Sequence, residues 1–84
     1  MAEKVWYLYI LRCDDGTLYT GITDDVQRRF NQHNAGKGAK YTRGRGPLVL
    51  VYQQACGAHG DALRREAQIK KLTRQEKLEL IEKK

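Results

Sequence analysis

Three groups of side chains in this sequence have the chemistry to bind a phosphate or to move a proton. Tyr9 and Tyr19 lie in predicted strands, and a phenol can orient or deprotonate a reacting oxygen. Arg29 and His33 lie four residues apart in a predicted helix. An arginine fork grips phosphate oxygens, and histidine titrates near neutral pH. Glu66 falls among the apolar positions of a later predicted helix, where a carboxylate has to be paired, bound to a metal or used in catalysis.

Each of these signals also has a purely structural explanation. Tyrosines in strands usually pack in a core, and we assign Tyr7 and Tyr52 to packing. His33 falls on the apolar stripe of its helix, which is typical of a core histidine. Glu66 and Lys70 have the i,i+4 spacing of an ion pair on a helix surface. No single signal therefore decides the function.

A predicted β-hairpin carries the two tyrosines. Residues 4–13 and 17–22 are apolar, aromatic and β-branched runs joined by an Asp-Asp-Gly turn. A two-residue loop would place Tyr9 and Tyr19 on opposite faces, because side chains alternate along a strand. A three-residue loop with its glycine in the left-handed conformation pairs Leu11 with Tyr19 and puts both phenols on one face. The sequence permits both loops. Shared chemistry requires the second, with both phenols on the same face as Arg29 and Glu66.

The remaining pattern predicts one further strand and three helices. They are a helix over 24–36, a strand over 48–52 after Pro47, a helix over 61–72 and a short third helix, with Asp24, Asp61 and Thr73 as N-caps. The order ββαβαα predicts a single α+β domain over residues 1–84, with a three-stranded, largely antiparallel sheet and flanking helices.

The charge of the chain points to a polyanionic partner. Sixteen Lys and Arg residues against ten Asp and Glu residues give a net charge of +6 on 84 residues. Between Val26 and Gly46 there are six basic residues and no carboxylate, so this charge is concentrated. We expect nucleic acid rather than a membrane as the partner. The phosphate contacts are expected from Arg28, Lys37, Lys40, Arg43 and Arg45, with Gly21 as a point of close phosphate approach.

The sequence also limits where the protein acts. No run approaches the roughly 18 apolar residues of a membrane span, and the first residues lack the pattern of a signal peptide. A cytoplasmic location is the expectation. Cys13 and Cys56 show no metal-ligand spacing and are expected to be free thiols. The oligomeric state stays open.

Taken together, the spacings resemble those of the GIY-YIG nuclease domain. The resemblance rests on Tyr-Leu-Tyr ending at Tyr9, Tyr-Thr-Gly beginning at Tyr19, Arg29 ten residues later, His33 four residues after that, and Glu66 in a later helix. It extends from about Val5 to Ile81. The short stand-alone bacterial members look most similar, through the stretches Tyr-Thr-Gly-Ile-Thr, Gly-Lys-Gly-Ala-Lys-Tyr-Thr and Leu-Arg-Arg-Glu.

The resemblance implies an endonuclease that hydrolyses phosphodiester bonds, with DNA favoured over RNA. Tyr9, Tyr19, Arg29, His33 and Glu66 would be catalytic, and Glu66 would hold one divalent cation, Mg²⁺ or Mn²⁺. Either tyrosine would act as the base, with His33 as the alternative. Arg29 would bind the phosphate.

This sequence departs from the family pattern at two places. The first triplet is Tyr-Leu-Tyr instead of Gly-Ile-Tyr, so Tyr7 is a second choice beside Tyr9. Some relatives have an Asn about one helix beyond the glutamate, where this chain has Arg74 and Lys77. An alternative function is a catalytically weak nucleic-acid-binding module that acts as a partner in DNA repair or processing. An interaction domain with no nucleic-acid role would leave the clustered charge unexplained.

Overall fold

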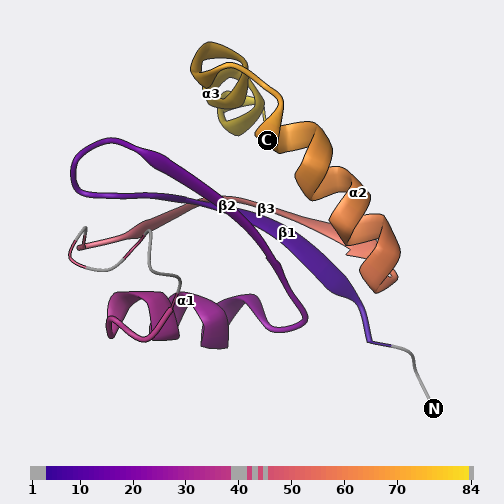
Figure 1. Cartoon of the computed structure of the whole chain (residues 1–84), viewed down its shortest axis with the longest axis horizontal. Helices are drawn as coiled ribbons and strands as arrows, with labels where there is room; N and C mark the ends of the chain where they lie inside the picture. Colours follow the sequence, from indigo (N-terminus) through magenta and orange to yellow (C-terminus); the bar gives the residue numbers. More distant parts are fainter. Residues whose placement is uncertain (1–3, 39–41, 43, 45, 84) are drawn as a thin grey trace.

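The computed structural model describes residues 4–38, 42, 44 and 46–83 and has the predicted order of elements (Figure 1). The elements are β1 Trp6–Arg12, β2 Leu18–Thr23, α1 Val26–Asn34, β3 Val49–Gly57, α2 His59–Lys70 and α3 Arg74–Glu82. Both ladders of the three-stranded sheet are antiparallel, and β1 lies between β2 and β3. The predicted α+β class is confirmed. None of the helices within the described ranges is long and apolar enough to cross a bilayer.

The hairpin between β1 and β2 has the three-residue loop. The N–H of Cys13 donates to the carbonyl of Thr17 at 2.8 Å, and Gly16 has a φ of +87°, the left-handed conformation that favours glycine. Leu11 lies opposite Tyr19, as the loop requires. The side chains of Tyr9 and Tyr19 therefore project from the same face of the sheet.

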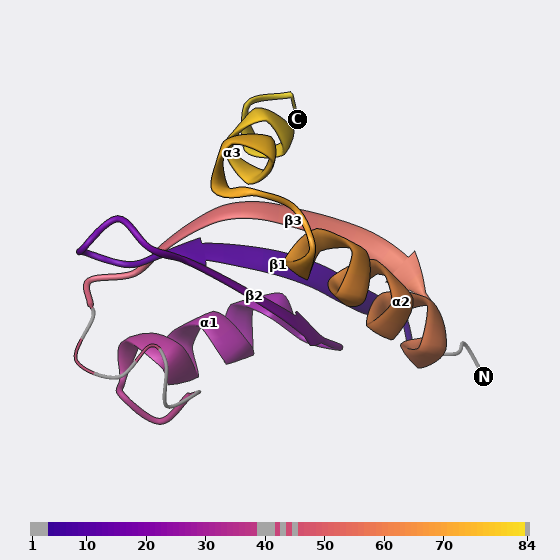
Figure 2. The ribbon, with the colours of Figure 1, turned by 45° about the horizontal axis from the view of Figure 1, so that its top comes forward.

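Each face of the sheet has its own apolar cluster. On one face, Tyr9, Leu11, Cys13 and Leu48 form a buried cluster against α1. On the other, Leu8, Ile10 and Tyr52 pack with Ile69 of α2, and residues of α3 complete this cluster. Figures 1 and 2 show α1 on one side of the sheet and α2 and α3 on the other. Alternate residues of β1 fill both clusters, because this central strand is covered on both sides.

Helix α1 begins one residue later than predicted. Its N-cap is Asp25, whose carboxylate accepts from the N–H of Arg28 at 3.0 Å, so the prediction of Asp24 as N-cap is wrong. The carboxylate of Asp24 instead pairs with Lys4 at 3.2 Å. The helix ends as the glycine at position 36 predicts: Gly36 has a φ of +77°, and the N–H of Lys37 returns to the carbonyl of Gln32 at 2.9 Å.

Helix α2 also differs from its prediction at both ends. It begins at His59 with Ala58 as its N-cap, and Asp61 lies within the first turn, where its carboxylate pairs with Arg64. An acidic residue in the first turn complements the helix dipole without capping the backbone, so the prediction of Asp61 as N-cap is wrong. Leu63 is apolar but lies on the outer side of the helix, where it is 45% exposed. The row that faces the sheet contains Ala62, Glu66 and Ile69.

The predictions for β3 and α3 had different outcomes. Strand β3 extends to Gly57, five residues beyond the predicted end, because its second half pairs with the first half of β1 as far as Trp6. Backbone pairing with a long neighbour outweighs the weak strand preference of its glutamines. In α3, Thr73 and Glu76 form the predicted capping box.

The hairpin loop gives a stability prediction. Gly16→Ala forces a Cβ into the left-handed conformation and should lower the free energy of unfolding by about 1–2 kcal/mol. Urea denaturation followed by circular dichroism measures this change. The matched control is Gly60→Ala in α2, where the added Cβ meets only the end of the Arg64 side chain at 3.8 Å. Because alanine has the higher helix propensity, this substitution should raise the free energy of unfolding by about 0.5–1 kcal/mol. Equal effects of the two substitutions would contradict the left-handed loop.

Candidate functional site

Tyr9 lies across strand β2 at Gly21, its direct partner in the ladder. A Cβ added at Gly21 would be 2.6 Å from the phenol oxygen of Tyr9 and 2.7 Å from its Cζ, so no other residue fits beneath this ring. The need for glycine at position 21 therefore comes from Tyr9. The side from which a Cβ would project is filled by the phenol, so close approach of a phosphate to Gly21 on that side is not possible without moving Tyr9.

The phenol of Tyr9 begins a buried chain of hydrogen bonds. Its oxygen lies 2.9 Å from Nε2 of His33, and Nδ1 of His33 lies 2.9 Å from Oγ1 of Thr42. Tyr9 and His33 are 2% exposed and Thr42 is 1% exposed. A Cβ at Gly38 would overlap the imidazole of His33, so a second glycine closes the other side of the ring. Tyr9, not Tyr7, is the tyrosine joined to His33.

Burial keeps this chain uncharged at neutral pH. It raises the pKa of Tyr9 to about 12, with a further contribution from the neighbouring phenol of Tyr19, while Arg29 acts in the opposite direction. Burial, and then the positive charge of Arg29, lower the pKa of His33 below its ordinary value. A neutral imidazole donates at one nitrogen and accepts at the other. The Tyr9–His33–Thr42 chain can therefore pass a proton in either direction without a buried charge at rest.

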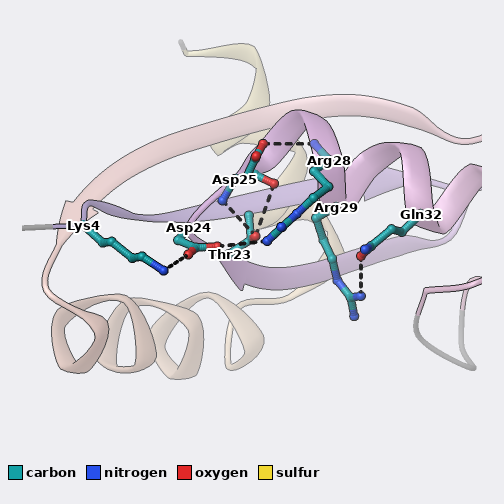
Figure 3. A network of polar contacts seen from close by, with 7 residues as sticks. All are labelled: Lys4, Thr23, Asp24, Asp25, Arg28, Arg29 and Gln32. Carbon is teal, nitrogen blue, oxygen red and sulfur yellow. Dashed lines mark hydrogen bonds and ion pairs between the residues drawn. The ribbon is translucent and has the colours of Figure 1, made fainter.

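Tyr19 and Arg29 form the outer part of the cluster. The half-buried ring of Tyr19 has its centroid 6.3 Å from that of Tyr9 and 5.2 Å from that of His33. Arg29 is also half-buried, and its Nη1 donates to Oε1 of Gln32 at 3.1 Å. Figure 3 shows this guanidinium turned away from the acidic residues at the start of α1. Phenol and guanidinium groups therefore meet at one solvent-accessible point above the buried histidine.

The adjacent arginine has different surroundings. Arg28 points toward the other side of α1, where its guanidinium lies 3.7 Å from the carboxylate of Asp24, which also binds Lys4 (Figure 3). Its side chain is 67% exposed. Lys37 is exposed just beyond the end of α1. The remaining predicted phosphate contacts, Lys40, Arg43 and Arg45, lie outside the described residues, so these assignments stay predictions.

Glu66 lies apart from this cluster. Its helix packs on the opposite face of the sheet, so the expectation that both phenols share a face with Glu66 is wrong. The reason is topological: α1 follows β2 on one face, and α2 follows β3 onto the other. The carboxylate forms the predicted i,i+4 pair with Lys70, with Nζ and Oε2 3.5 Å apart, and its side chain is 21% exposed.

The route between the two halves passes around strand β2, which is an edge of the sheet. A cavity of about 270 Å³ beside this strand is lined by Tyr19 and by Lys70, the partner of Glu66. Among the described residues, no group of three or more His, Cys, Asp or Glu side chains is placed to hold a metal ion. Any cation at Glu66 would need most of its ligands from water and from a bound substrate.

Sequence reasoning missed two contributors to the cluster. Thr42, which contacts His33, comes from a glycine-rich basic stretch for which only phosphate contacts were predicted. Gly38 closes the histidine pocket from the same stretch. The repeated glycines were the available signal, because a glycine can mark the close approach of a ring as well as a turn.

Comparison with known proteins identifies the family to which the sequence is similar. The profile of the GIY-YIG catalytic domain matches residues 5–79. A UPF0213 protein of Streptococcus agalactiae serotype V is 56% identical over 81 residues, which cover 96% of this chain and 92% of the relative. A UPF0213 protein of Cronobacter sakazakii is 54% identical over 76 residues, which cover 90% of this chain and 80% of the relative.

Two solved structures are similar to this protein in both fold and sequence. The solution NMR structure of a UPF0213 protein from Bacillus halodurans has a TM-score of 0.63 and 50% sequence identity, and the match covers 95% of this chain and 85% of that chain. The solution NMR structure of a protein from E. faecalis has a TM-score of 0.62 and 38% identity, with 93% and 84% covered.

The contact between Tyr9 and Gly21 can be tested by a double-mutant cycle. Gly21→Ala should displace the phenol and lower the free energy of unfolding by about 1–3 kcal/mol. In a Tyr9→Leu background, which removes the ring, the same change should cost at least 0.5 kcal/mol less, the lower end of the coupling range for touching residues (~0.5–3 kcal/mol). Urea denaturation of the four proteins measures the coupling. Additive effects would show that the two residues are not in contact.

The lowered pKa of His33 gives a pH dependence. Between the lowered folded value and the ordinary value of 6.5, the unfolded chain binds a proton that the folded chain rejects. The contribution of His33 is therefore fully present above pH 6.5 and falls as the pH drops through the folded pKa. From pH 7.5 to 5, the wild type should lose more unfolding free energy than His33→Gln. An NMR titration should give His33 a pKa below 6.5, and a value above 6.5 would refute the buried neutral ring.

Proposed function

This chain belongs to the GIY-YIG family of catalytic domains, and on that premise we propose that it is a metal-dependent endonuclease that hydrolyses DNA phosphodiester bonds with little sequence specificity. Membership of this family implies a nuclease-type fold. The observation that carries the proposal is the 2.9 Å contact of Tyr9 with His33 beside Tyr19 and Arg29. A purely structural histidine would not need two phenols and a guanidinium around it.

The two phenols have different roles in this proposal. Tyr9 is buried and its pKa is raised to about 12, so it stays protonated and holds the geometry of the cluster. Tyr19 is half-buried and faces the point that a phosphate would occupy, so its oxygen is the one that can reach an attacking water. We therefore favour Tyr19 as the group that orients or deprotonates the water, with His33 assisting behind it.

The proton balance of hydrolysis suits this arrangement. The oxygen of water forms a bond to phosphorus, the bond from phosphorus to the leaving oxygen breaks, and the water loses a proton while the leaving oxygen gains one. The phenol of Tyr19 would take the proton of the water as it gives its own proton to solvent, and the leaving oxygen would take a proton from solvent. Buried contacts with Tyr9 and Thr42 hold His33 in place, and His33 would assist by keeping the cluster below this phenol oriented.

Arg29 would supply positive charge to the reacting phosphate. The side chain is anchored through Gln32 and half-buried, so it is held in place before the substrate arrives. A fixed guanidinium next to a phosphate stabilises charge that grows on the phosphate oxygens in the transition state. The loss of one such group from a preorganised site typically costs about 10²–10³ in rate.

The cation would be held by Glu66. This carboxylate is partly exposed and lies 3.5 Å from the ammonium of Lys70, so a cation that binds it would replace that ammonium as its positive partner. Mg²⁺ is commonly bound by one or two carboxylates together with substrate phosphates, which fits a single glutamate. When bound, Mg²⁺ or Mn²⁺ would neutralise charge on the phosphate and help the leaving oxygen. We propose that substrate completes this cation site.

The second candidate function is a nucleic-acid-binding module with weak catalysis, a partner in DNA repair or processing. The separation of Glu66 from the tyrosine cluster by the sheet favours it, because a site divided in this way depends on the substrate to join its halves. In both functions the basic residues on and after α1 supply affinity through phosphate contacts, so binding should weaken steeply as salt rises.

A plasmid-nicking assay tests the enzyme. Wild-type protein with supercoiled DNA and Mg²⁺ or Mn²⁺ should convert the plasmid to the nicked form, and EDTA should abolish the conversion. Arg29→Ala, Glu66→Ala and Tyr19→Phe should each lower the rate by about 10²-fold or more while DNA binding is retained.

The matched controls are Arg64→Ala and Glu79→Ala, which remove the same charges from exposed positions of α2 and α3. Both should nick DNA at the wild-type rate. Equal nicking by all variants would identify a contaminating nuclease. Binding without nicking by the wild type would support the binding module instead.

A further inference from the structure

A groove with basic side chains follows the open edge of strand β2. The cavity of about 270 Å³ beside Tyr19 is lined by Leu18, Thr20, Lys70 and Lys77. A second cavity of about 190 Å³ shares Leu18 and Lys77 with it and adds Arg74. The two form one groove between β2 and helices α2 and α3, on the far side of the sheet from α1.

The charges of this groove have one sign. Its lining contains Lys70, Arg74 and Lys77 and no carboxylate. Lys70 pairs with Glu66, but no carboxylate in the described part of the chain forms an ion pair with Arg74 or Lys77. Arg74 packs near the hairpin turn, with a guanidinium nitrogen 3.9 Å from the Cβ position of Gly16. Arg74 and Lys77 therefore lie together beside the edge of β2, and no carboxylate of the described residues pairs with either of them.

The strand contributes hydrogen-bond donors to the same groove. Thr20 is 4% exposed, and its Oγ1 is the buried side-chain oxygen that finds no partner among the described residues. The ladder bond from Cys13 to Thr17 fixes the alternation of β2, so the N–H groups of Leu18 and Thr20 point away from β1, toward the open edge. A buried hydroxyl without a hydrogen-bond partner lowers the stability of the fold. An anion bound in the groove would accept its hydrogen bond and remove this penalty.

We propose that this groove binds the phosphodiester backbone of the substrate next to the bond that is cut. The proposal rests on the proposed function, because the groove begins at Tyr19 and at the partner of Glu66. A nucleic-acid strand that passes from Arg29 around the edge of β2 to Lys77 and Arg74 would contact both halves of the site. The N–H groups, hydroxyl and cations match successive phosphate oxygens and do not read bases.

The test compares two charge-matched double variants. Arg74→Gln/Lys77→Gln removes both groove cations that have no carboxylate partner, and Lys71→Gln/Lys83→Gln removes two exposed lysines outside the groove. Binding of a mixed-sequence 30-base-pair duplex is measured over a salt series, with inorganic phosphate as a competitor. Each lost phosphate contact should lower the salt slope by about 1, so the groove variant should fall by about 2 and the control by less than 1.

Thr20→Val supplies a second measurement. If the hydroxyl serves only the fold, removing it should raise the Tm by about 4–8 °C, as expected for about 1 kcal/mol in a domain of this size, and leave DNA binding unchanged. The proposal expects the same gain in Tm together with a severalfold loss of DNA affinity. Unchanged affinity in Thr20→Val, or equal salt slopes in the two double variants, would overturn the groove. Strong competition by millimolar inorganic phosphate would overturn it as well, by identifying a site for the free anion.

The two proposals fail separately. A wild-type protein that nicks DNA, with equal salt slopes in both double variants, would keep the nuclease and remove the groove. A wild type that never nicks, with a salt slope lowered only in the groove variant, would remove the nuclease and keep the groove as a binding surface.

Discussion

The packing of Tyr9 between Gly21 and His33 is the constraint on which the rest of this site depends. The phenol fits only because the residue opposite it has no side chain, and it reaches His33 only because α1 lies on the same face. The three-residue hairpin loop supplies the register, since a loop one residue shorter would turn Tyr19 to the other face. One left-handed glycine thus determines whether the phenols, the histidine and Arg29 can meet at all.

The sequence predicted the hairpin, the element order and the cluster on α1 because these depend on local spacing. Arg29 and His33 are one helical turn apart, so periodicity fixes their relative positions. For Tyr9 and Tyr19, strand alternation left two hairpin loops open, and the structure has the three-residue loop. Helix starts were less predictable, because Asp24 and Asp25 are equally good caps by type. In the structure Asp24 pairs with Lys4, and Asp25 is the residue that caps the helix. The length of β3 depends on pairing with β1, which local propensity does not contain.

The position of Glu66 shows where local reasoning ends. Helical spacing correctly placed it on the inward row of α2, but which face of the sheet that helix covers is decided by chain connectivity across β3. The contact of His33 with Thr42 was missed for a related reason. Thr42 follows the end of α1 in the sequence, and no helical period connects it to His33.

A site divided by an edge strand has a physical consequence for specificity. Among the described residues, neither half offers a metal or a phosphate a full set of ligands, because Glu66 is a single carboxylate and the tyrosine cluster contributes only the guanidinium of Arg29. A ligand that spans both sides of β2 gains from each half at once, because the second contact forms within the same complex. A short or compact anion reaches only one half. Under the proposed function, the fold would select polymeric phosphodiesters by length rather than by base sequence, because the basic side chains are proposed to contact phosphates and not bases.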